Sequence, residues 1–365
     1  DKARILWFGD SMIEGDMITQ HVRDSLQKIF RGKGIGYVPL TSPISGFRMT
    51  IRNNFSDNWK RFDYVHHDNP KFPLSINGKY HYVEYDSSSS KQIHQKLKVS
   101  FKGGYKFKKV RILPNPQLLY GPRIKGENYK DTSNYFVFNN DTFRLKGNSN
   151  MNSIHLSSKS HTKVNCEFFC KPDQALYGMT FNSDTGVFLD NFSSRGNSGM
   201  LLAGIPKNTY RRYKQIAGAD LIILQYGVNV STPGVTNYEW YARSMTRVVE
   251  HLNEALPNVP IIIVSMADRA TKKNKEMTTD TSVYAINSEL KAVANKTKAV
   301  YFNLFKKMGG KNSIKKWVEE KNPALANKDY THLNFRGSKK VANFFIEFLM
   351  KRYKKFKSNE VQSNI

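Results

Sequence analysis

The sequence contains very little cysteine and no long hydrophobic run. Its two cysteines, Cys166 and Cys170, lie four residues apart, and a regular strand would separate them by about 13 Å, too far for a disulfide. We therefore expect free, partly buried thiols. One such pair supplies only half of a tetrahedral zinc site, so we expect no metal. No run of about 18 apolar residues occurs, so we expect no transmembrane segment.

Acidic residues are also scarce relative to basic ones. The 365 residues include 57 Lys and Arg but only 30 Asp and Glu, a formal net charge of +27 at pH 7. Such a charge favours anionic partners, either nucleic acid or an envelope polymer that carries carboxylates and phosphates. A solvated, lysine-rich surface explains the charge equally well. No motif that reads nucleic acid is present, so we expect no nucleic-acid partner.

Two hydrophobic patterns divide the chain. The apolar run at 5–8 precedes a helical spacing that continues to residue 29. After residue 190, apolar runs alternate with helical stretches, at 221–225, 237–256, 261–265, 281–297, 299–304 and 338–353. Strands that alternate with helices of this length predict an α/β fold with a parallel sheet covered on both faces.

The middle of the chain has a different pattern of short alternating runs separated by Gly, Asn, Ser and Pro. These runs lie at 80–85, 97–101, 109–113, 135–138, 164–169 and 176–181. Many short strands at such spacing predict an antiparallel β-sandwich that resembles a jelly roll. We therefore expect one α/β domain, formed by residues 1–47 and 189–365, with residues 48–188 inserted as the sandwich.

Three polar clusters lie beside predicted elements of the α/β part: Gly9-Asp10-Ser11, Gly227-Val228-Asn229 and Asp329-Tyr330-Thr331-His332. Ligands bind at the carboxyl ends of the strands in an open parallel sheet, so these positions favour a shared site. A serine in a tight turn before a helix is either a nucleophile or an N-cap. An Asp three residues before a His either orients that His as a base or belongs to a surface turn.

The chain order of these clusters resembles the SGNH (GDSL-type) hydrolase superfamily, over residues 1–45 and 186–365. The resemblance implies a three-layer, flavodoxin-like α/β fold that uses neither a cofactor nor a metal. It also implies Ser11 as nucleophile, His332 as base and Asp329 as the residue that orients the base, with Asp10 as a further member of the nucleophile block.

The same resemblance implies an oxyanion hole with three donors. Two of them are the backbone N–H of Ser11 and the side-chain amide of Asn229. The third is a glycine N–H from the block Arg195-Gly196-Asn197-Ser198-Gly199, within which we favour Gly199 over Gly196.

An SGNH domain with a β-domain inserted after its nucleophile block resembles bacterial peptidoglycan O-acetylesterases and O-acetyltransferases. Residues 16–19, 36–39 and 190–192 contribute to this likeness. It implies a serine esterase that removes O-acetyl groups from a cell-wall glycan through an acetyl-Ser intermediate, and an insert similar to a carbohydrate-binding module. The aromatic residues of the insert either stack on sugars or pack in its core, as for Tyr105, Tyr120 and Tyr135.

Two alternatives remain open at this point. A transferase would use the same triad with a membrane acetyl-exporting protein as partner, and a non-catalytic glycan-binding protein would use the scaffold alone. The expected partner in each case is an acetylated, anionic glycan. We expect an extracytoplasmic location, periplasmic or associated with the cell envelope. The sequence opens at Asp1, with neither an initiator methionine nor a signal peptide, which indicates a processed or trimmed chain.

Other polar residues carry weaker signals. Four histidines of the insert lack metal-ligand spacing, and we expect surface or loop positions for His66, His67, His81 and His94. Asp268 follows a predicted strand, and it either lines the rim of the site or makes structural hydrogen bonds.

Overall fold

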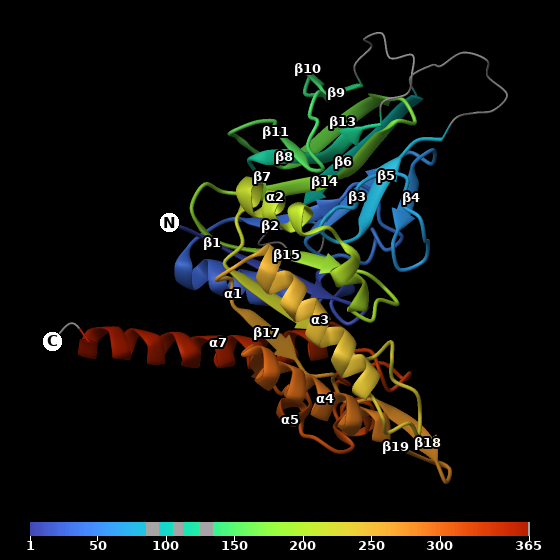
Figure 1. Ribbon diagram of the computed structural model, residues 1–365, viewed down its shortest axis with the longest axis vertical. Helices are drawn as coiled ribbons and strands as arrows, with labels where there is room; N and C mark the ends of the chain where they lie inside the picture. The colour runs from blue at the N-terminus through green and yellow to red at the C-terminus, as the bar shows by residue number, and fades with distance from the viewer. Residues whose placement is uncertain (85–94, 105–111, 125–133, 364–365) are drawn as a thin grey trace.

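The structure, a computed structural model, describes residues 1–84, 95–104, 112–124 and 134–363. It is a mixed α/β fold in which a parallel sheet with its helices lies next to two antiparallel sheets (Figure 1). The predicted α/β class and its parallel sheet are therefore confirmed. Among the described residues, no helix combines the length and the apolar character needed to cross a membrane.

The parallel sheet has the strand order β15-β1-β16-β17-β20. Its strands are β1 Lys2–Gly9, β15 Gly186–Ser193, β16 Leu221–Gln225, β17 Ile261–Val264 and β20 Val300–Phe302. Side chains alternate between the two faces of a strand. In β1, Leu6 and Phe8 belong to one buried cluster, and Ile5 and Trp7 belong to another. The sheet is therefore covered on both faces, as its continuous apolar strands require.

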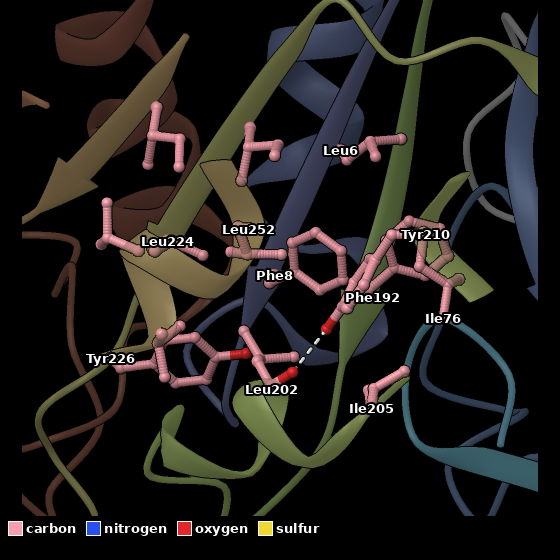
Figure 2. Packing of buried hydrophobic residues seen from close by; sticks show 14 of the residues in the cluster. Leu6, Phe8, Ile76, Phe192, Leu202, Ile205, Tyr210, Leu224, Tyr226 and Leu252 are labelled. Atoms are coloured by element: carbon pink, nitrogen blue, oxygen red, sulfur yellow. Dashed lines mark hydrogen bonds between the residues drawn. The ribbon is translucent and has the colours of Figure 1, made fainter. Parts of the chain in front are cut away.

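Helices from distant parts of the chain form these two covers. The cluster around Leu6 and Phe8 includes side chains of α2 Lys207–Ala217, α3 Glu239–Ala255 and α4 Thr281–Thr297. The opposite cluster includes side chains of α1 Thr19–Phe30, α5 Leu304–Met308, α6 Ser313–Glu319 and α7 Phe335–Ser363. Figure 2 shows the first cluster, in which Tyr210 of α2 lies near Phe192 of β15 and its hydroxyl donates to the Leu202 carbonyl.

The predicted helix at 281–297 coincides with α4. The last helix is longer than the predicted 338–353 because α7 spans Phe335–Ser363. Its C-terminal part extends beyond the neighbouring elements (Figure 1). The apolar spacing in this part is interrupted by lysines, so the sequence pattern ended before the helix did.

Two antiparallel sheets form the second region. One has the order β10-β9-β13-β6-β3, with bounds Asp141–Arg144, Tyr135–Phe138, Lys163–Cys170, Gln95–Gly103 and Ile51–Phe55. The other has the order β11-β8-β14-β5-β4, with bounds Asn152–His155, Pro116–Arg123, Gln174–Asn182, Lys79–Tyr82 and Lys60–Asp63. Strand β2, Gly34–Pro39, also pairs with β14, so residues before position 48 join this region.

The remaining elements are short. Two small antiparallel pairs join β7 Leu113–Pro114 to β12 Ser160–His161 and β18 Ala270–Lys273 to β19 Glu276–Thr279. Two 3₁₀ turns are η1 Glu14–Asp16 and η2 Met200–Gly204. Of the predicted strand at 109–113, residues 109–111 lie outside the described residues.

The two antiparallel sheets share one apolar core. Phe101 of β6 and Phe181 of β14 meet across it, with ring centroids 5.5 Å apart. Cys166 and Cys170 are free and buried in this core. They are thus fully buried rather than partly so, and this burial raises the pKa of the Cys166 thiol to about 12.

One histidine of this region lies where the sequence did not place it. His81 is in β5 and fully buried, so the expectation of a surface or loop position is wrong for it. His66 and His67 are exposed, as expected, and His94 lies outside the described residues. Tyr120 packs in the shared core, which excludes sugar stacking there.

The other two aromatic candidates differ from Tyr120. Tyr135 is only partly buried and stacks on Phe169, with ring centroids 4.8 Å apart. Tyr105 lies outside the described residues.

Candidate functional site

The site begins at the carboxyl end of β1. This strand, which lies between β15 and β16, ends at Gly9, and residues 10–13 turn sharply into η1. A Cβ at Gly9 would lie 2.9 Å from the Ile13 side chain and 3.1 Å from the Gln225 carbonyl oxygen, so there is little room for a larger residue at this turn. The turn places the Ser11 hydroxyl oxygen 3.0 Å from Nε2 of His332, a residue 321 positions further along the chain.

Asp329 holds the opposite side of the His332 ring. Its Oδ2 lies 2.8 Å from Nδ1 of His332, and its Oδ1 accepts the backbone N–H groups of Thr331 and His332 at 3.0 and 2.9 Å. Partial burial on its own raises the pKa of Asp329, but the hydrogen bonds from His332 and Thr331 outweigh it and hold that pKa below its ordinary value. An ionised Asp329 favours a proton on Nδ1, which leaves Nε2 free to accept one from Ser11.

A cavity of about 500 Å³ opens beside this line of side chains. Ser11, His332, Asp329, Asn229 and Gly196 all line it. Apolar side chains complete its walls, from Met12, Met17, Ile44, Phe47 and Leu333. The side chains of His332 and Asp329 are 41% and 50% exposed, so water reaches the triad directly.

Three residues that line the same cavity carry hydrogen-bond donors that are not used up. Within the described part of the chain, the backbone N–H groups of Ser11 and Gly196 donate to no other group. The side-chain amide of Asn229 donates one N–H to the Asn197 carbonyl at 2.9 Å, and an amide nitrogen carries two hydrogens. These groups form a set of donors of the kind that stabilises an oxyanion.

The N–H of Gly199, the glycine favoured from sequence, is already engaged in the structure. Its N–H donates to Oδ1 of Asn197 at 2.8 Å, and it does not line the cavity. Its φ of 91° and the ring of Tyr226, only 2.6 Å from where a Cβ would lie, require a glycine for reasons of local structure. Gly196, which we placed second, lines the cavity instead.

Asp10 is also directed away from the main cavity. Its Oδ1 accepts the N–H of Met12 at 2.9 Å, and burial raises its pKa to about 7. It lines a smaller cavity that also contacts Asp268. Asp268 accepts hydrogen bonds from Thr279, Ser313 and Ile314, which is the structural alternative considered for it.

Sequence reasoning missed a buried ion cluster next to the site. Asp16 in η1 accepts two hydrogen bonds from Arg23, one from Arg48 and two from the hydroxyls of Thr19 and Thr50. Burial on its own raises the pKa of Asp16, but the two guanidinium groups outweigh it and lower that pKa well below its usual range. The cluster joins η1, α1 and the segment before β3. Asp16 and Thr19 belong to the run 16–19 that contributes to the family likeness, but no local spacing reveals their contacts with Arg23 and Arg48.

A second ion pair, also missed, lies at the cavity rim. Nε and Nη2 of Arg195 donate to Oε2 of Glu14 at 2.9 and 2.7 Å. Both residues line the Ser11 cavity. No group of three or more His, Cys, Asp or Glu within the described ranges is arranged to hold a metal ion.

No protein-family model matches the sequence, and no curated protein matches it either. A solved structure of a peptidoglycan O-acetylesterase aligns with a TM-score of 0.76 at 18% identity, over 97% of this chain and 92% of that chain. The chain has the fold of that esterase. Because the alignment takes in nearly the whole chain, the shared fold includes the antiparallel sheets as well as the parallel one.

Shorter structures align with the chain less well. A carbohydrate esterase of family 3 from Talaromyces cellulolyticus has a TM-score of 0.34 at 17% identity, over 46% of this chain and 72% of that chain. A GDSL-like lipase from Parabacteroides merdae has a TM-score of 0.32 at 16% identity, over 44% of this chain and 72% of that chain.

Proposed function

We propose that this chain is a serine esterase that removes O-acetyl groups from a bacterial cell-wall glycan. The observation that carries the proposal is the hydrogen-bonded line from Ser11 through His332 to Asp329 at the edge of an open cavity. Nucleophile, base and orienting carboxylate in this geometry are the requirements for acyl transfer. The fold shared with a peptidoglycan O-acetylesterase supports the choice of substrate.

The geometry suits a two-step reaction. Nε2 of His332 accepts the Ser11 hydroxyl proton, and the serine oxygen attacks the acetyl carbonyl. The N–H groups of Ser11 and Gly196 and the amide of Asn229 stabilise the oxyanion. His332 then donates its proton to the departing sugar oxygen, which leaves an acetyl group on Ser11. Water loses a proton to His332, attacks this ester and releases acetate, and Ser11 recovers its proton.

The remaining proposals concern the polymer and its location. A net charge of +27 attracts an anionic wall polymer. We interpret the antiparallel sheets, most of which residues 48–188 supply, as an inserted β-sandwich similar to a carbohydrate-binding module. An enzyme with such a substrate works outside the cytoplasm, in the periplasm or at the cell envelope.

Water access distinguishes the esterase from its alternatives. A transferase must keep water from the acetyl-serine, whereas the side chains of His332 and Asp329 are 41% and 50% exposed. This exposure favours hydrolysis, and no observation in the described residues favours a membrane acetyl donor. A glycan-binding protein without activity does not require a serine, a histidine and an aspartate in hydrogen-bond contact.

The decisive experiment removes the Ser11 hydroxyl. We expect Ser11→Ala to lower kcat on p-nitrophenyl acetate and on O-acetylated peptidoglycan by about 10³-fold or more, with the unfolding midpoint retained. Ser198→Ala is the matched control, because its half-buried hydroxyl lies in the neighbouring loop outside the triad. Free acetate and polymer-bound acetyl are measured together. Turnover by Ser11→Ala at the wild-type rate would end the proposal, and a rise in bound acetyl would identify a transferase.

A further inference from the structure

The C-terminal part of α7 extends beyond the elements that pack against the rest of the helix (Figure 1). Phe348 and Leu349 still pack against one of the two core clusters of the parallel sheet. The residues from 351 to 359 are all exposed. The reaction described above does not use this segment, so its surface is open to another role.

Apolar side chains continue along one face of the exposed segment. Leu349, Tyr353 and Phe356 follow one another at spacings of four and three residues, which places them on one side of a helix. Tyr353 is 40% exposed and Phe356 is 58% exposed. The end of α1 lies beside them, because the ring centroids of Phe30 and Tyr353 are 5.0 Å apart, and Ile29 is 50% exposed. Large apolar side chains therefore gather at this end of the molecule.

The same segment is strongly basic. Residues 351–359 include five Lys or Arg and no Asp or Glu. Lys351, Lys354 and Lys355 form no ion pair with any described residue. The guanidinium group of Arg352 lies 4.7 Å from the ring centroid of Phe348, on the flank of the apolar face. We call residues 351–356 together with Ile29 the C-terminal patch.

We propose that the C-terminal patch binds the surface of an anionic lipid bilayer. A helix with one apolar face and a basic polar face lies in the plane of such a surface. Ile29, Tyr353 and Phe356 enter the boundary between headgroups and acyl chains, and the basic side chains are attracted to the negative charge of the lipid phosphates.

Two other occupants fit the patch less well. A second copy of the chain would bring two patches of the same positive charge together, and these repel each other. A soluble polyanion would neutralise the lysines but would leave the three apolar side chains in water. An anionic bilayer accommodates both the charges and the apolar side chains, and this decides the choice.

The Ser11 site lies at the other end of the same helix. α7 begins at Phe335, three residues after His332, and its 29 residues span about 40 Å. A bilayer bound at the C-terminal patch is therefore remote from the reacting groups. The inference does not depend on the proposed esterase activity, and failure of one leaves the other intact.

The test measures binding of the full chain to lipid vesicles by co-sedimentation. The vesicles contain phosphatidylcholine alone or phosphatidylcholine with an equal part of phosphatidylglycerol. We expect the partition coefficient to be about tenfold or more higher for the anionic vesicles, because each basic residue near such a surface strengthens binding by about fivefold. Equal binding to both kinds of vesicle, or binding to neither, would overturn the inference.

One variant tests the apolar side chains without changing the charge. We expect Ile29→Gln/Phe356→Gln to lower the partition coefficient onto anionic vesicles by about tenfold or more, since two half-exposed apolar side chains no longer enter the bilayer. Phe55→Gln/Val235→Gln removes two exposed apolar side chains elsewhere and should bind as the wild type does. Wild-type binding by Ile29→Gln/Phe356→Gln would show that net charge alone attracts the vesicles, which contradicts the inference.

A second variant tests the charges. We expect Lys354→Gln/Lys355→Gln to lower the same partition coefficient by about tenfold. Lys272→Gln/Lys273→Gln removes two exposed lysines of β18, far from the C-terminus (Figure 1), and should have a much smaller effect. Equal losses in these two variants would mean that the patch has no special part in binding.

The remaining occupants have signatures of their own. Binding to dissolved polyglutamate without binding to anionic vesicles would identify a soluble polyanion and overturn the inference. A dimer that sedimentation equilibrium detects in the wild type and not in Ile29→Gln/Phe356→Gln, without vesicle binding, would identify a second copy. Wild-type thermal unfolding midpoints in all variants show that a loss of binding does not result from loss of fold.

Discussion

The parallel sheet and the antiparallel sheets both bury apolar side chains, but they differ in where their strand ends place polar side chains. Parallel strands all end on one side, so the turns after β1 and β16 bring Ser11 and Asn229 to the same edge. Antiparallel strands end alternately on opposite sides, so their carboxyl ends do not gather at one edge. The comparison teaches that strand direction decides where reacting groups gather.

The antiparallel region lines a different cavity, of about 90 Å³, beside the Ser11 cavity. Asn53, Arg61, Lys79 and His81 lie on its strands and line this cavity, while none of the proposed triad residues comes from it. It therefore supplies a wall rather than reacting groups. Substitutions at the carboxyl edge of the parallel sheet should therefore change kcat, whereas substitutions in the antiparallel region should change stability or KM.

The largest effect on stability should come from Asp16, at the junction of the two regions. Asp16→Asn removes the buried charge that holds Arg23 and Arg48 and leaves two guanidinium groups without a counterion. We expect the free energy of unfolding to fall by about 3–5 kcal/mol, measured by urea denaturation. The control is Asp24→Asn, whose ion pair with the exposed Lys28 is worth less than about 1 kcal/mol. Equal losses in both variants would show that the buried cluster contributes no more to stability than an exposed ion pair.

A smaller effect, confined to activity, should come from Asn229 on the parallel-sheet side. Asn229→Ala removes one donor to the proposed oxyanion, so we expect kcat on p-nitrophenyl acetate to fall by about 10²–10³-fold with little change in KM. Asn165→Ala, on an exposed position of β13, should leave kcat unchanged. A kcat for Asn229→Ala within threefold of wild type would remove Asn229 from the oxyanion hole.

The smallest of these effects should come from His81 in the antiparallel region. We expect His81 to make the free energy of unfolding depend on pH. Burial lowers the pKa of His81 to about 4, whereas a histidine in an unfolded chain has a pKa of about 6.5. The unfolded chain therefore binds the proton more tightly. The contribution of neutral His81 is fully present above pH 6.5 and is lost as pH falls towards 4, a change of about 3 kcal/mol.

His81→Gln tests this assignment. The variant should lose less stability than the wild type between pH 7 and pH 4 in urea titrations, and it should retain the kcat of the wild type. His155→Gln, an exposed histidine on β11, should follow the wild-type curve. If His81→Gln and the wild type show the same pH dependence, another group carries it.

Local apolar spacing predicted the elements whose periodicity is strong, such as α4 at 281–297. For the candidate site, the positions of the polar clusters beside predicted elements suggested that Ser11 and His332 would meet. The Gly199 N–H donates to the Asn197 side chain, which weighs against the choice of Gly199 over Gly196, and no sequence spacing reveals this hydrogen bond. The burial of His81 was missed because it depends on two contacts from distant segments, the Thr41 N–H and the Leu176 carbonyl.

The pairing of β1 with β15 has a consequence for biosynthesis. Lys2 pairs with Gly186, so the first strand finds this neighbour only after the whole antiparallel region has been made. At about 5–20 residues per second, a nascent chain exposes that apolar edge for on the order of ten seconds or longer. An unpaired strand is prone to aggregation, and His332 emerges later still. The newly made protein therefore passes through an inactive, association-prone stage before its ends meet.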